Sequence, residues 1–169
     1  MWYNIFMSIF YKSARVGKNG NSFWMLKFRT LKEVDKTSHF TTEDQYLPLG
    51  KFLRKTKLDE LPQIWNVLRG EMALIGPRPE EARTIDLLPE DTRKILLSVK
   101  PGMVDLASLY FFDEEKILQE SPDMAYDYWV KVKPIKTLFQ VFYIKNRSLA
   151  LNLWLLWATF WRIIRSFFR

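Results

Sequence analysis

Cysteine is absent from the 169-residue chain, and histidine occurs once, as His39. The absence of cysteine excludes disulfides, thiolate catalysis and cysteine-ligated metal centres, and one histidine cannot form a metal cluster by itself. His39 stands among polar residues, so we expect an ordinary loop residue there.

A long hydrophobic run is also missing from the start of the chain. Crossing a bilayer takes about 20 predominantly apolar residues, and the apolar stretch over residues 1–11 is shorter and lacks the features of a secretory signal. Apolar residues nevertheless make up 48% of the chain and aromatic residues 16%, which argues against intrinsic disorder. The length predicts one domain over residues 1–169 with a real hydrophobic core.

Acidic residues are missing from the last part of the chain. Residues 131–169 hold eight Lys/Arg and no Asp/Glu, residues 58–130 hold seven and fifteen, and residues 11–57 hold eleven and four. An acidic centre suits a divalent metal, and basic ends suit phosphates or an anionic membrane. The same segregation argues against a nucleic-acid-binding module, because the acidic middle would repel a phosphate backbone.

Residues 149–169 contain neither proline nor glycine, and their pattern predicts a helix with a cationic side opposite a broad aromatic side. Such a helix is typical of one that lies in a membrane interface. The alternative is a helix packed on the domain core. The expected interface residues are Trp154, Trp157, Trp161, Arg162 and Arg165.

Two extended segments, residues 11–16 and 21–29, flank the sequence Gly17-Lys18-Asn19-Gly20. The Asn-Gly pair predicts a hairpin turn between them. Lys27 and Arg29 alternate with apolar residues, so both cations are expected on one face of the second strand. Two parallel cations suit a diphosphate, and the alternative is a solvated strand face.

The middle of the chain predicts a series of short elements. We expect helices over residues 49–55, 57–70, 80–86, 90–98 and 123–133, a strand over residues 71–75 and a turn at residues 100–102. The helix over residues 57–70 has one apolar stripe, formed by Leu61, Ile64, Trp65 and Leu68. Pro62 must lie in its first turn, because proline lacks an N–H. That makes Asp59 the expected N-cap and places Glu60 beside the positive end of the helix dipole.

The pair Asp59-Glu60 is the strongest candidate for chemistry. One carboxylate could attack phosphorus while a metal neutralises charge, with cations on neighbouring elements. Arg78 stands between two prolines and has little backbone freedom, which prepares its guanidinium for a phosphate group. The alternative for Asp59 is purely structural, since Asp is an ordinary N-cap residue worth about 1 kcal/mol.

The run from Arg54 to Pro79, which contains Lys57-Leu58-Asp59-Glu60-Leu61-Pro62-Gln63-Ile64-Trp65-Asn66 and Gly76-Pro77-Arg78-Pro79, closely resembles the signature of bacterial sugar transferases. Those enzymes are the monotopic polyprenol-phosphate phosphoglycosyl transferases. Residues 15–30, 99–103 and 143–149 match further segments of the family pattern, so the resemblance extends over residues 9–165.

The resemblance implies transfer of a sugar 1-phosphate from a UDP-sugar to undecaprenyl phosphate with release of UMP, the first membrane step of surface polysaccharide or glycan synthesis. Asp59 is then the nucleophile, and Glu60 helps to hold Mg²⁺ or manages the proton of the acceptor phosphate. The residues expected to contact the substrate phosphates are Lys27, Arg29, Arg54, Arg78 and Lys100. The expected location is the cytoplasmic face of the bacterial inner membrane, and a homo-oligomer is left open.

Together the elements predict a compact α/β (α+β) domain, mostly helical with a small sheet or hairpin. Family members normally begin with a re-entrant hydrophobic helix interrupted by a Ser-Pro pair, and we expect this chain to start after it. Many relatives carry Thr-Gly where this chain has Val104-Asp105, a difference expected to affect substrate specificity at most. Because the re-entrant helix is expected to be missing, a second hypothesis keeps the fold and the membrane-surface location without catalytic turnover. No residue decides which UDP-sugar is used.

Overall fold

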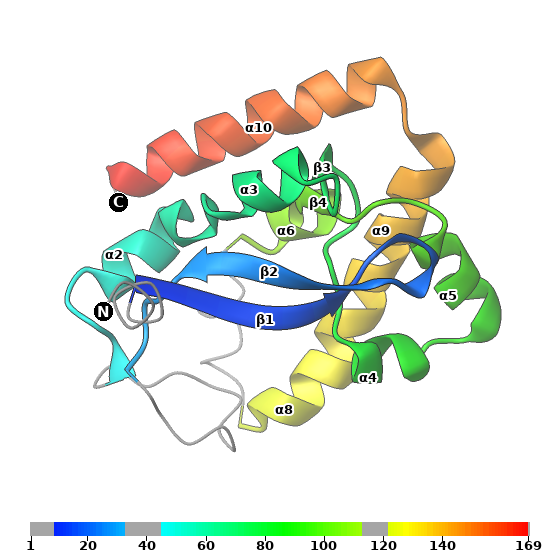
Figure 1. The fold of residues 1–169 in the computed structure, drawn as a ribbon, viewed down its shortest axis with the longest axis horizontal. Coiled ribbons are helices and arrows are strands. Elements are labelled where there is room, and N and C mark those ends of the chain that lie inside the picture. The colour runs from blue at the N-terminus through cyan, green and yellow to red at the C-terminus, as the bar shows by residue number, and fades with distance from the viewer. Residues whose placement is uncertain (1–8, 33–44, 113–121, 169) are drawn as a thin grey trace.

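The computed structural model describes residues 9–32, 45–112 and 122–168. Helices dominate these residues, and the strands form two small two-stranded sheets (Figure 1). The fold is a mixed α/β domain, as the sequence predicts. The prediction for His39 and most of the apolar N-terminal stretch lie outside the described residues.

The predicted hairpin is confirmed. β1 (Phe10–Val16) pairs antiparallel with β2 (Ser22–Phe28) along its whole length. The chain reverses through a 3-10 turn, η1 (Lys18–Gly20), in which Asn19 and Gly20 have φ angles of 58° and 81°. Asn and Gly tolerate this left-handed backbone better than other residues, which is why their pairing predicts the turn.

A second, smaller sheet lies at the centre of the chain. The predicted strand is present as β3 (Ala73–Ile75), and it pairs parallel with β4 (Gly102–Val104), a strand too short to show an alternating pattern in the sequence. The chain segments beside the two strands approach very closely, because a Cβ atom on Gly102 would lie 2.0 Å from the nitrogen of Gly76. This contact holds the loop that carries Arg78 against β4.

The remaining described elements are helices and single helical turns: α2 (Gly50–Lys55), η3 (Leu58–Glu60), α3 (Gln63–Leu68), α4 (Ala82–Asp86), α5 (Glu90–Leu97), α6 (Leu106–Tyr110), α8 (Met124–Asp127), η4 (Tyr128–Val132), α9 (Lys133–Asn146) and α10 (Leu149–Phe167). The helices predicted over residues 49–55, 80–86, 90–98 and 149–169 are confirmed with shifted ends. The helix predicted over residues 123–133 is the first part of a longer helical run.

The prediction of one helix over residues 57–70 is wrong. Lys57 has a left-handed backbone with φ of 58°, and the chain then makes the single 3-10 turn η3 before α3 starts after Pro62. Asp59 is therefore not the N-cap of α3, and it makes no capping hydrogen bond. Proline is compatible with either start because both leave its missing N–H in the first turn.

The helical run at the end of the chain contains the π-helical turn η4, immediately before α9. Pro134 has no N–H to donate to the carbonyl four residues earlier, and a widened turn accommodates that loss. Buried Lys133 donates to the carboxylate of Glu80, and Gln140 Nε2 lies 3.4 Å from the same carboxylate oxygen. These contacts fasten α9 to the loop that carries Arg78.

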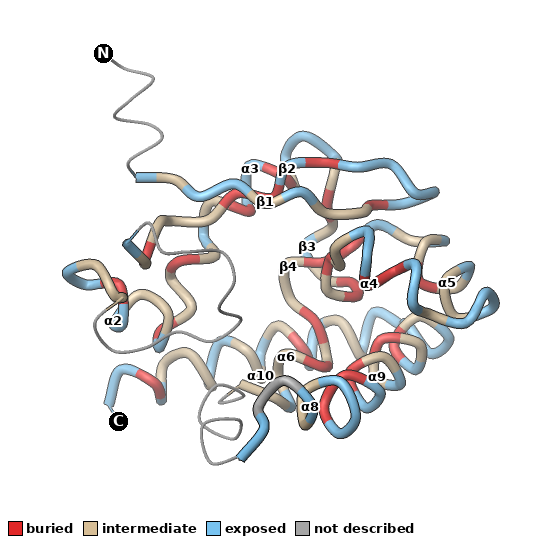
Figure 2. Tube along the Cα trace, turned by 90° about the horizontal axis from the view of Figure 1, so that it is seen from below, coloured by how far each residue is buried: buried red, intermediate tan, exposed pale blue. Residues whose placement is uncertain are grey.

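A small apolar cluster connects the hairpin to the second sheet. Phe23 and Met25 of β2 pack with Met72, and Val67 and Met103 lie against them. Figure 2 shows buried positions as short stretches spread over many elements, with exposed positions between them.

α3 is oriented with its polar side inward. Gln63 and Asn66 are 1% and 0% exposed, whereas the predicted apolar stripe is on the outside. Its exposed members are Leu61, Ile64, Trp65 and Leu68. An amphipathic helix on a water-soluble core would have the opposite orientation.

α10 has the same orientation. Leu155 and Ser166 are buried, and Asn152 accepts a hydrogen bond of 2.9 Å from the Tyr143 hydroxyl of α9. The exposed large apolar residues of α10 are Leu149, Leu153, Trp154, Trp157, Phe160, Trp161 and Phe167. α10 therefore packs on the domain through the side that carries Asn152, Leu155 and Ser166, and its aromatic side is exposed. Figure 1 places α2, α3 and α10 on the same side of the hairpin.

Candidate active site

Asp59 and Glu60 occupy the η3 turn, which faces the inner side of the hairpin. Asp59 is only 6% exposed, and the side chain of Glu60 is also largely buried. Ions in such surroundings need charged or hydrogen-bonding partners, because burial removes their hydration. The two neighbouring carboxylates meet this need differently.

Glu60 is held by two cations from distant parts of the chain. Lys27 Nζ, from β2, lies 2.9 Å from Oε1. Arg78 Nη2 also lies 2.9 Å from Oε1, and Arg78 Nη1 is 3.5 Å from Oε2. Lys27 of the hairpin and the proline-flanked Arg78 thus meet at one carboxylate.

These contacts dominate the protonation of the cluster. Burial acts to raise the pKa of Glu60, but the charges and hydrogen bonds of Arg78 and Lys27 hold that pKa well below its usual range. Burial lowers the pKa of Lys27, although the charge and hydrogen bond of Glu60 act to raise it. Glu60 raises the pKa of Arg78. Glu60 is therefore a permanent anion at neutral pH.

Asp59 differs from Glu60 in its surroundings. Its Oδ1 atom is buried and has no hydrogen-bond partner among the residues that the structure describes. Burial raises the pKa of Asp59, and Glu60 adds to this, while the cations of Lys27, Lys57 and Arg54 act to lower it. The structure thus places a desolvated carboxylate oxygen among positive charges, and such an oxygen can accept an electrophile or a cation.

Asn66 fixes the position of α3 against the hairpin. Its Oδ1 accepts from the backbone N–H of Leu26 at 3.1 Å, and its Nδ2 donates to the carbonyl of Trp24 at 2.8 Å and to Glu71 at 2.7 Å. The fully buried amide fixes α3 to β2. Lys27, the next residue of the strand, is thereby placed beside the η3 turn.

The other predicted phosphate contacts have different positions. Arg54 influences Asp59 through its charge. Arg29 follows β2 and is partly buried, and its Nε atom is buried without a hydrogen-bond partner in the described part of the chain. Lys100 instead lines a pocket formed with Lys18 and Arg147, and that pocket is not lined by Asp59, Glu60 or Lys27.

Sequence reasoning did not identify the support around Arg78. Asp105 caps α6 by accepting from the Ser108 N–H at 2.9 Å, and the Ser108 hydroxyl lies 3.4 Å from Arg78 Nη1. Asp105 also contributes to the raised pKa of Arg78. Asp is a favoured N-cap residue, so Asp105 was a signal for the start of a helix that the sequence offered.

A divalent metal fits this site on the chemistry of its donors. The described residues hold no group of three or more His, Asp or Glu side chains that could form a metal cage. Mg²⁺, however, usually binds through one or two carboxylates together with substrate phosphates and water. The free Oδ1 of Asp59, with Glu60 beside it, provides such a partial site.

Comparison with known proteins adds a family to this geometry. The family model described as bacterial sugar transferase matches residues 3–166. A protein of Haemophilus influenzae named as an uncharacterized sugar transferase is 33% identical over 88% of this chain and 32% of its own length. The UDP-galactose-lipid carrier transferase of Erwinia amylovora is 32% identical, also over 88% of this chain and 32% of its own length.

A third relative is the undecaprenyl-phosphate galactose phosphotransferase of Salmonella typhimurium. It is 30% identical over 93% of this chain and 33% of its own length. The chain therefore spans about a third of the length of these three curated relatives.

Proposed function

The chain belongs to the bacterial sugar transferase family, and on that premise we propose that it transfers a sugar 1-phosphate from a UDP-sugar to undecaprenyl phosphate, releasing UMP. The observation that carries the proposal is the buried Oδ1 of Asp59, which has no partner, next to a fully engaged Glu60. The names of two relatives, one with a lipid carrier and one with undecaprenyl phosphate, support the same chemistry.

Asp59 is the proposed nucleophile. In the first step its carboxylate oxygen attacks the phosphorus nearer the sugar, a new P–O bond forms, and the bond from that phosphorus to the bridging oxygen breaks. The electron pair leaves with UMP. In the second step an oxygen of undecaprenyl phosphate attacks the same phosphorus, and the carboxylate of Asp59 is released.

The cations around the carboxylates would stabilise the charge that develops on the phosphates. Lys27 and Arg78 are already positioned by Glu60, so they need no rearrangement when the substrate binds. Arg54 and Arg29 are further candidates on charge and position. The low pKa of Glu60 supports a role as a fixed anion that orients these cations, since so weak a base is poorly matched to proton transfer near neutral pH.

Asp59 and Glu60 are also the residues that we propose for holding Mg²⁺. When bound, the ion would supply positive charge for the phosphate oxygens of the donor substrate. One oxygen of the Asp59 carboxylate could hold the ion while the other attacks phosphorus, and Glu60, which Lys27 and Arg78 hold in place, would add negative charge beside it.

We propose that the exposed apolar sides of α3 and α10 lie on the cytoplasmic face of the bacterial inner membrane. None of the helices in the described part of the chain is both long and apolar enough to cross a bilayer. Contiguous exposed apolar surface on a protein marks an interaction site, and aromatic residues suit the membrane interface. Trp154, Trp157 and Trp161 would lie at headgroup level, with Arg162 and Arg165 beside them.

The test is trapping of the intermediate. Purified protein in detergent is mixed with Mg²⁺ and a panel of UDP-sugars labelled in the phosphate nearer the sugar, without acceptor, and quenched. The wild type should release UMP and retain label on the protein, and Asp59→Ala should do neither. Asp91→Asn, which changes an exposed carboxylate of α5, is the matched control and should behave as the wild type.

The same experiment separates the alternatives. Label retained by Asp59→Ala would place the nucleophile elsewhere. Absence of UMP release from every sugar, with and without undecaprenyl phosphate, would favour a membrane-surface protein without turnover.

A further inference from the structure

A second basic site lies away from the carboxylate pair. It is an open pocket of about 310 Å³ between the η1 turn, the β3 strand and the ends of α5 and α9. Its polar side chains are Lys18, Ser98, Lys100, Tyr143 and Arg147. None of the described residues that line the pocket is acidic, so the charge that they contribute is entirely positive.

The three cations of this pocket are not neutralised by the protein. Within the described ranges, Lys18, Lys100 and Arg147 form no ion pair. Tyr143 is buried, and its hydroxyl already donates to Asn152, which leaves its oxygen as an acceptor beside Arg147. All three cations are exposed to solvent, and together they give the cavity a positive potential that attracts an anion.

The pocket is distinct from the proposed catalytic cluster. Its lining contains none of Lys27, Asp59, Glu60 and Arg78, although the prolyl residue Pro77 next to Arg78 contributes to its wall. Lys100 was expected among the substrate-phosphate contacts from the sequence, and the structure gives it these different neighbours instead.

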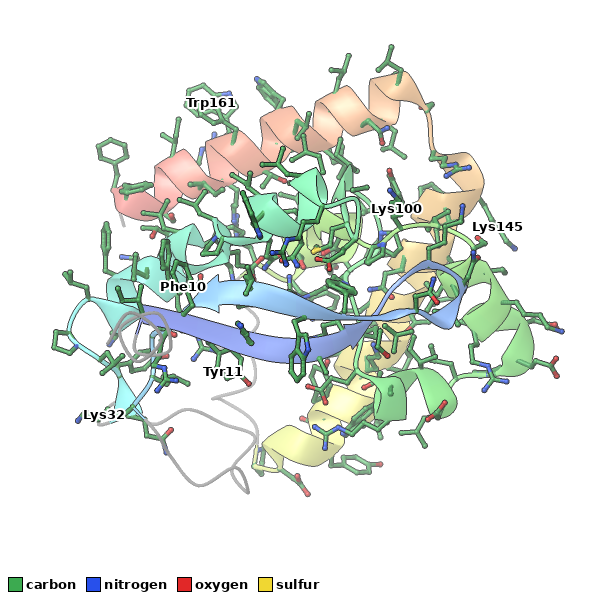
Figure 3. The ribbon with its side chains drawn as sticks, in the orientation of Figure 1. Phe10, Tyr11, Lys32, Lys100, Lys145 and Trp161 are labelled. Atoms are coloured by element: carbon green, nitrogen blue, oxygen red, sulfur yellow. The ribbon has the colours of Figure 1, made fainter. Side chains whose placement is uncertain are left out.

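The pocket lies between the ends of the two helices with exposed apolar sides. Arg147 is the C-cap of α9, two residues before α10 begins, and the Tyr143–Asn152 hydrogen bond joins both helices there. Lys100 Nζ lies 3.4 Å from the place where a Cβ atom on Gly70, just after α3, would be. Figure 3 shows Lys100 and Lys145 on this part of the molecule, near the end of α9.

We propose that this pocket binds the phosphate headgroup of an anionic membrane lipid. This inference rests on the proposed membrane placement of α3 and α10, because that placement puts the pocket at the level of the headgroups. A lipid phosphate carries a negative charge and acceptor oxygens, which suit two lysines and an arginine with no acidic competitor. The bound lipid would anchor the start of α10 and the end of α3 together.

The test is vesicle binding of the full chain. Lys18→Ala/Arg147→Ala removes two cations of the pocket, and Lys51→Ala/Lys55→Ala removes two exposed cations from α2, which contacts the other end of α10 through Phe52 and Phe167. Vesicles of phosphatidylcholine are compared with vesicles that also contain phosphatidylglycerol. The pocket variant should bind the anionic vesicles about ten-fold more weakly than the α2 variant, because loss of a site exceeds loss of diffuse attraction. All three proteins should bind phosphatidylcholine alike.

Inorganic phosphate distinguishes the two sources of such an anion. It should release the wild type from anionic vesicles beyond the effect of chloride at equal ionic strength, and it should not do so for the pocket variant. Equal binding of both variants to anionic vesicles would overturn the proposal, and if phosphate still binds the wild type, the site takes a free phosphate.

The UMP assay in neutral detergent keeps this inference separate from the proposed function. The pocket variant should show an unchanged KM for the UDP-sugar. A raised KM together with unchanged vesicle binding would assign the pocket to the nucleotide donor and overturn the lipid proposal. If the wild type does not release UMP but the vesicle results are as expected, the proposed transferase activity is contradicted and the lipid site is still supported.

Discussion

Arg78 holds Glu60 through both terminal nitrogens of its guanidinium, with Nη2 at 2.9 Å from Oε1 and Nη1 at 3.5 Å from Oε2. Lys27 donates to the same Oε1 atom, so one carboxylate balances two cations from a strand and a loop. The arrangement makes the charge of Glu60 important for folding as well as for the proposed chemistry.

Glu60→Gln should lower the free energy of unfolding by about 3 kcal/mol, because it leaves Lys27 and Arg78 partly buried without a counter-charge. Urea denaturation measures this. Glu81→Gln is the control, since Glu81 is a more exposed carboxylate that also pairs with two arginines, and it should cost less than about 1 kcal/mol. Similar losses of unfolding free energy in the two variants would contradict a special role for Glu60 in holding Lys27 and Arg78.

The stability contributed by Glu60 should depend on pH. Its pKa in the folded protein lies well below the ordinary value of 4.5, so its contribution is complete above that value and is lost as the pH falls through the folded-state pKa. The stability difference between wild type and Glu60→Gln should therefore be constant near neutral pH and shrink in acid. Denaturation curves from pH 7 downward measure it, and a difference that persists at the lowest pH would refute this account.

The pH profile of UMP release should have an acidic limb, in which kcat/KM falls as Asp59 becomes protonated. Burial raises the pKa of this carboxylate, and the nucleophile is lost as the pH falls through that raised value. Arg54→Ala removes a cation that lowers the pKa, so the limb should move to higher pH. The pH profile of kcat/KM measures the shift, and Lys55→Ala, a neighbouring exposed cation, should leave the limb in place.

Asn66→Ala should destabilise the protein by about 3 kcal/mol, because it leaves the buried N–H of Leu26 and the carbonyl of Trp24 without partners. Thermal or urea denaturation tests this. The control is Asn146→Ala, which removes an exposed side-chain hydrogen bond to the Phe142 carbonyl and should change stability by less than about 0.5 kcal/mol.

Trp157→Ser should weaken binding to phosphatidylcholine vesicles about ten-fold, because it removes a large apolar side chain from the proposed interface. Trp24→Ser is a close control, since Trp24 on β2 is 62% exposed and Trp157 is 61% exposed. If both substitutions weaken vesicle binding equally, α10 is not the membrane-facing element. Neither should lower stability by much, as both side chains already face solvent.

The sequence predicts the hairpin and the helix at the end of the chain because their signals are local. The Asn19-Gly20 pair needs a left-handed backbone, and the pattern after Leu149 continues for many turns without a breaker. The Asp59-Glu60 pair and Arg78 were also identified, and the structure brings them together with Lys27.

What the sequence did not predict depends on contacts between distant residues. The η3 turn replaces the start of a helix because Lys57 adopts a positive φ, a choice that places Glu60 against Lys27 and Arg78. The sequence also could not show that Lys100 lines a basic pocket separate from Asp59 and Glu60, because residues far apart in the chain form that pocket. Helical periodicity locates the apolar stripe of α3, but it does not say whether that stripe meets a protein core or a lipid.

The outward apolar sides of α3 and α10 also determine whether the purified protein should self-associate in solution. Surface of this kind drives molecules to associate in water, and net charge of +7 opposes that only in part. We expect the purified chain to sediment as large aggregates in plain buffer and to become monodisperse once detergent micelles cover these helices. Its solubility should therefore report on the same surface that the cell would use.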